Sequence, residues 1–264
     1  MLFDRSLRLQ LSLFWSQESP FELSNSAAID RLQAAFEPAD GQQPMGLHLQ
    51  NAAHQPGVEL VPPATPRVAL PAVTWSSGGF WRVSLTPMRL DVFFDPIAFA
   101  QARDIDTPRE DVFLGDVVAR AVPVMTTAVG LWSVSRLALV MRAEANMDVS
   151  DAARIVAQRA FSTEIQRGVE TGDVADVEFR VNRPTAWTLP GMDESIRVNR
   201  LETCSAIWGL AGSQVQSFFR LERDVNTTPQ FPGRVPEAAS SAFFSQAQEW
   251  IMPGLTEVAR TGAK

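Results

Sequence analysis

Segments in which apolar and polar residues alternate with a period of two constrain the fold of this chain more than any other feature. Between residues 6 and 15 every second residue from Leu7 to Leu13 is leucine, and the residues between the leucines are polar. The same alternation recurs over 88–95, 177–182 and 214–226. A period of two is typical of a half-buried strand, so we expect antiparallel sheet with one apolar face.

Helical periodicity marks the ends of these strand runs. A short helix is predicted over about 27–36, after the capping residues that precede it, and another over about 150–162. Longer helices are predicted over about 109–129 and 237–260, and each contains a proline. Helices that cover antiparallel strands indicate the α+β class, with long helices packed on the sheets, rather than a doubly wound parallel sheet.

The order strand, short helix, several strands, long helix occurs twice. The first set occupies residues 1–131 and the second occupies 132–264. A tandem duplication of one unit explains this order, and two unrelated α+β modules explain it as well. The two halves can also form one fused domain.

Composition limits the chemistry and the compartment. The formal net charge is −7, which argues against a dedicated binder of nucleic acid or of an anionic membrane. No run of eighteen apolar residues and no signal peptide is found, and Cys204 is the only cysteine, so we expect a cytoplasmic protein without an intrachain disulfide. Lys264 is the only lysine, which argues against Schiff-base and P-loop chemistry.

Familiar catalytic and cofactor motifs are missing from the sequence. It contains no glycine-rich phosphate loop and no nucleophile elbow, so we expect no cofactor and favour a non-catalytic protein. One acidic set is a weak candidate for a divalent metal site, because carboxylates bind Mg²⁺ or Ca²⁺. The same acids also suit the start of a helix with Pro108 at its first position. The set consists of Asp104, Asp106, Glu110, Asp111 and Asp116.

Several aromatic and basic residues are out of place for a sheet with one buried face. Phe14 and Phe93 are out of phase with the apolar positions of their strands, and Phe218 lies beside Phe219. The second face is therefore expected to be covered, either by a helix or by another chain. Arginines at 180, 183, 197, 200, 220 and 223 can pair across strands with Glu178, Glu202, Glu222 and Asp224 on a solvent face, or can meet a partner. The interface candidates are Phe14, Phe93, Phe218, Arg180, Arg197, Arg220, Arg223 and Trp250.

Three stretches also support a resemblance, namely GFWRVSLT at 79–86, RLALVMRAEAN at 136–146 and FRLERDVN at 219–226. In the order of its elements the chain resembles a sporadically distributed bacterial family of uncharacterised proteins of similar length. Its topology is also similar to that of SecB-like export chaperones, which have a small antiparallel sheet and long helices. The family has no assigned activity and implies no catalytic residue. The resemblance implies paired acids at 224–226, which this sequence lacks because position 226 is Asn226.

The sequence thus predicts a protein-binding subunit, adaptor or chaperone-like module that meets a protein partner or a second copy of itself. A metal-assisted enzyme that uses the acidic set at 104–116 is the first alternative. A nucleic-acid contact through the arginines is the second alternative, and the acidic balance of the chain argues against it.

Overall fold

The computed structural model describes residues 6–15, 26–36, 47–48, 73–77, 80–86, 89–103, 110–160, 177–211, 214–227 and 235–251. The strands are β1 (Ser6–Trp15), β2 (Leu47–His48), β3 (Val73–Ser77), β4 (Trp81–Leu85), β5 (Arg89–Phe94), β6 (Val134–Asn146), β7 (Glu178–Asn182), β8 (Thr185–Trp187), β9 (Ile196–Ala211) and β10 (Gln214–Thr227). The helices are α1 (Ser26–Phe36), α2 (Pro96–Arg103), α3 (Glu110–Leu131), α4 (Val149–Ala160) and α6 (Glu237–Ile251).

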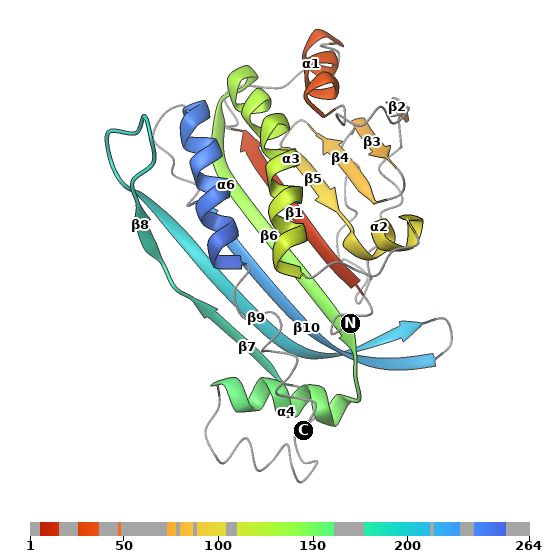
Figure 1. Ribbon diagram of the computed structural model, residues 1–264. Coiled ribbons are helices and arrows are strands. Elements are labelled where there is room, and N and C mark those ends of the chain that lie inside the picture. The colour runs from red at the N-terminus through yellow and green to blue at the C-terminus, as the bar shows by residue number, and fades with distance from the viewer. Residues whose placement is uncertain are drawn as a thin grey trace, which may run out of the picture.

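The described strands form one antiparallel sheet in the order β2-β3-β4-β5-β1-β6-β10-β9-β7, and β8 pairs with β9. The order is symmetric about the central pair of β1 and β6, because β5 and then β4 follow on one side, and β10 and then β9 on the other. Helices α3 and α6 lie side by side over one face of this sheet (Figure 1). The predicted α+β class with antiparallel pairing is therefore confirmed.

The leucines of β1 explain why this face is buried. Leu9 lies opposite Phe94 of β5 and Met141 of β6, and all three side chains are at most 2% exposed. Apolar residues of α3 and α6, such as Met125 and Phe243, belong to the same buried cluster. The apolar faces of the strands and the apolar stripe of α3 therefore pack into one core, and hydrophobic burial holds the sheet and the helices together.

Two of the helices begin at aspartate caps. The backbone N–H groups of Ile97 and Ala98 donate to Asp95, each at 3.0 Å, and so start α2. The backbone N–H and hydroxyl of Ser150 donate to Asp148 at the start of α4, and these bonds lower the pKa of Asp148. The start of α4 agrees with the prediction, whereas α2 was missed because its eight residues are too few to display a clear apolar stripe.

Candidate binding face

The face of the sheet opposite α3 and α6 is the candidate site, and we call it the open face. Because side chains alternate along a strand, the pairing register decides which residues share this face. Gln10 of β1 lies opposite Phe93 of β5 and Val140 of β6, and Val140 lies opposite Asp224 of β10. None of these four belongs to the buried cluster beneath the helices.

Arginine side chains cover the aromatic rings of the open face. The guanidinium of Arg82 lies 4.4 Å from the ring centre of Phe93. Those of Arg89 and Arg136 lie 5.8 and 5.1 Å from the ring centre of Phe14. Such contacts stabilise a ring and a cation together, which explains why phenylalanine is tolerated out of phase.

Phe218, on β10, also has a guanidinium group close to its ring. Arg220 lies 5.4 Å from its ring centre, and the phenylalanine is 1% exposed. Phe219, the next residue, belongs to the buried cluster on the helix side. The prediction that Phe218 and Phe219 lie on opposite faces of the sheet is therefore correct.

Ion pairs join β6 and β10 across the open face. Arg142 pairs with Glu222 at 2.6 Å, and Arg220 pairs with Glu144 at 2.7 Å. Each pair consists of direct neighbours in the antiparallel register. Glu222 and Arg220 thus pair across strands as predicted, but their partners, Arg142 and Glu144, were not among the predicted residues.

Arg223 and Glu202 were expected to pair across strands on a solvent face; the pairing is correct, but the solvent face is wrong. Their ion pair, at 2.8 Å, is buried on the helix side, with 7% and 10% of the two side chains exposed. Residues 220 and 223 are an odd number of positions apart, so a strand points them to opposite faces. Arg223 also donates to the carbonyl of Ile251 at the end of α6, at 2.8 Å.

A shallow pocket of about 290 Å³ lies on the open face over β6, β7, β9 and β10. Its lining includes Arg142, Arg180, Thr203, Glu222 and Asp224. Burial raises the pKa of the Asp224 carboxyl, whereas a hydrogen bond from Asn226 (2.9 Å) and the nearby charge of Arg136 oppose the rise.

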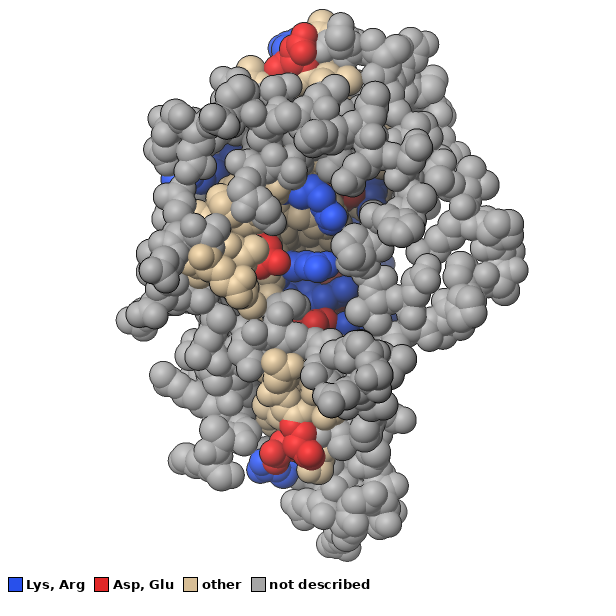
Figure 2. Space-filling model, turned by 90° about the vertical axis from the view of Figure 1, so that its right-hand side faces the viewer, with Lys and Arg blue, Asp and Glu red and all other residues tan. Residues whose placement is uncertain are grey.

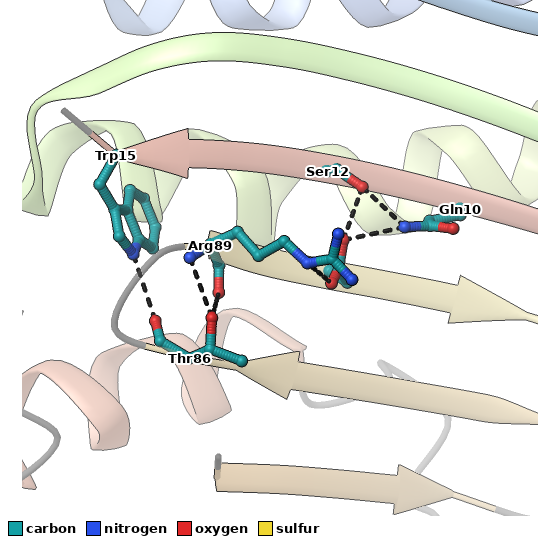
Figure 3. A network of polar contacts seen from close by, with 6 residues as sticks. Gln10, Ser12, Trp15, Thr86 and Arg89 are labelled. Carbon is teal, nitrogen blue, oxygen red and sulfur yellow. Dashed lines mark hydrogen bonds and ion pairs between the residues drawn. The ribbon is translucent and has the colours of Figure 1, made fainter. Parts of the chain in front are cut away.

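A second polar network surrounds Asp91 in β5 (Figure 3). Its carboxylate accepts hydrogen bonds from Ser12 (2.6 Å) and Gln10 (2.9 Å), and its other oxygen pairs with Arg89 (2.7 Å). The side chain of Asp91 is only 2% exposed. The network therefore satisfies a buried charge and fixes the guanidinium of Arg89 beside β1.

The structure brings six of the eight interface candidates onto the open face, as the register shows. They are Phe14, Phe93, Phe218, Arg180, Arg197 and Arg220. The other two, Arg223 and Trp250, lie together at the end of α6, where Arg223 is 5.8 Å from the indole ring centre.

Other arginines of the open face were missed by the sequence argument. They alternate with the buried residues of their strands, so the same period of two could have identified them. They are Arg8, Arg82, Arg89, Arg136 and Arg142.

The remaining candidates lie elsewhere or cannot be placed. Asp104 and Asp106 are outside the described residues, and Glu110, Asp111 and Asp116 fall in the first two turns of α3, where side chains are not described. Within the described part of the chain no three potential ligands lie together as a metal site would require. Cys204 is buried and forms no disulfide.

No protein-family model matches the chain, and a search of curated proteins finds no match either. A helix long and apolar enough to cross a membrane is not present in the described part of the chain.

Proposed function

We propose that this chain is a non-catalytic protein-binding module that presents the open face of its sheet to a partner, as a subunit, an adaptor or a chaperone-like protein. The observation that carries the proposal is the convergence of six interface candidates on one face, while the other face is buried beneath α3 and α6. Arginine and aromatic residues are enriched where proteins recognise one another.

A reducing, cytoplasmic setting belongs to the same proposal. Cys204, the only cysteine of the sequence, is 0% exposed and forms no disulfide, which suits a compartment in which thiols stay reduced. We infer that the two halves of the chain, residues 1–131 and 132–264, arose by duplication. The symmetric strand order around β1 and β6 supports that inference.

Photo-crosslinking tests the proposed function. A benzoylphenylalanine placed at Asn182 or Ala186 samples the open face, and one placed at Ala119 or Ser245 samples the exposed side of the helices. We expect one discrete protein to be crosslinked from both open-face positions in native lysate and from neither helix position. Crosslinks from the helix positions alone, or from no position, would contradict the proposal.

A further inference from the structure

Positive charge is unevenly distributed over the open face. On the side formed by β6, β7, β9 and β10, arginines and carboxylates alternate and pair, as Arg142 does with Glu222. On the side formed by β4, β5, β1 and the start of β6, the register places four arginines on the open face and one carboxylate, that of Asp91, which pairs with Arg89. We call these four the basic corner, and they are Arg8, Arg82, Arg89 and Arg136.

Asp91 does not neutralise the basic corner. Its two oxygens already accept from Ser12, Gln10 and Arg89 (Figure 3). Among the described residues no carboxylate forms an ion pair with Arg8, Arg82 or Arg136. Asp91 and Asp224 act on Arg82 and Arg136 only at longer range. Arg8 lies opposite Arg142 and Arg136 lies opposite Phe14, so these two arginines lie toward opposite ends of β1, and a ligand that meets all three arginines has to be extended.

Two further observations show that their surroundings do not fully stabilise the guanidinium groups of Arg82 and Arg136. Burial and the neighbouring charge of Arg8 lower the pKa of Arg82, and Asp91 offsets only part of this effect. The Nε atom of Arg136 is buried without a hydrogen-bond acceptor. A buried donor without an acceptor costs about 1–3 kcal/mol, so an anion that reached it would be stabilised.

The side chains of the basic corner indicate which kind of anion it binds. The rings of Phe14 and Phe93 lie beneath guanidinium groups, so their faces are occupied and do not offer a stacking platform for bases. A guanidinium stacked on a ring is held in plane and keeps N–H groups at its edge for a carboxylate. Figure 2, which looks onto the side of the molecule that carries β3 and β4, shows basic groups of the described residues gathered in the middle of this side, with acidic groups beside them.

We propose that the basic corner binds an extended acidic segment of the partner protein, with glutamate or aspartate carboxylates on Arg8, Arg82 and Arg136. This inference rests on the proposed function and names the chemistry of the partner. It also accounts for a local excess of positive charge in a chain whose formal net charge is −7.

Fluorescence anisotropy with a labelled deca-glutamate peptide tests the inference. The R8Q/R136Q variant removes two unpaired guanidinium groups, and R180Q/R197Q removes two arginines from the other side of the same face. We expect R8Q/R136Q to weaken binding by about tenfold or more, and R180Q/R197Q to change it by less than about twofold. Because Arg8 is exposed, the single variant R8Q keeps the test valid if R136Q disturbs folding, and it should weaken binding too.

A deca-glutamine peptide and a deoxythymidine decamer complete the design. Absence of deca-glutamate binding, or equal loss in both double variants, would overturn the inference, as would tighter binding of the decamer than of deca-glutamate. If deca-glutamate fails to bind while the open face still crosslinks to a protein, only the acidic nature of the partner is wrong. If deca-glutamate binds but crosslinks form only from the helices, the proposed function is wrong.

Discussion

Replacing Arg223 by methionine should destabilise this protein far more than removing any exposed arginine. Arg223 pairs with Glu202 at 2.8 Å and donates to the carbonyl of Ile251 at 2.8 Å, so it joins the sheet to the end of α6. Methionine keeps much of the aliphatic volume but removes the guanidinium that donates to the buried carboxylate of Glu202 and to the carbonyl of Ile251. Removing one partner of a buried ion pair costs about 3–5 kcal/mol, and we expect a loss within that range.

Urea denaturation measures this loss as a change in the free energy of unfolding. R197M is the matched control because Arg197 is exposed on β9, and its effect should stay within about 0.5 kcal/mol. The double variant E202M/R223M removes both charges and should recover most of the stability, since hydrophobic replacement of a buried pair is often close to neutral. If R223M destabilises no more than R197M, or if the double variant is no better than R223M, the buried pair does not hold α6 to the sheet.

Three further substitutions or probes test other parts of the structure. Because burial raises the pKa of Asp224, ionisation of this carboxyl opposes folding, and stability is lost as pH rises above about 4. D224N should therefore be more stable than the parent protein at neutral pH but not in acid. A difference in urea midpoints that stays constant with pH would argue against this. F14L removes the ring beneath two guanidinium groups and should cost about 1 kcal/mol beyond its change in volume, as a cycle with R89Q can show. Cys204 should not react with a thiol reagent until the chain unfolds, and rapid labelling of the native protein would contradict its burial.

The alternation of residues predicted which apolar residues of β1, β5, β7 and β10 face the buried side of the sheet. Phe14 and Phe93 were recognised as out of phase because a period of two needs no knowledge of the tertiary fold. The α+β class followed from the same pattern together with the helices, and the structure agrees with it.

The partners of individual polar residues could not be predicted in this way. Asp91 and Ser12 are 79 positions apart in the sequence, and Arg220 and Glu144 are 76 apart, so only the strand order brings them together. The arginines at 220 and 223 were grouped by nearness in sequence although they point to opposite faces. The unpaired state of Arg136 depends on its neighbours in three dimensions and has no signature in the sequence.

Nuclear magnetic resonance of the arginine side chains tests most directly whether the open face is a recognition surface. Each arginine has one Nε–H group, whose signal responds to a carboxylate that binds beside it. On addition of deca-glutamate, the signals of Arg8, Arg82 and Arg136 should shift, and those of Arg31 and Arg120 on the helices should not. Shifts confined to Arg31 and Arg120, or no shift in any of the five, would contradict an open face that recognises acidic partners.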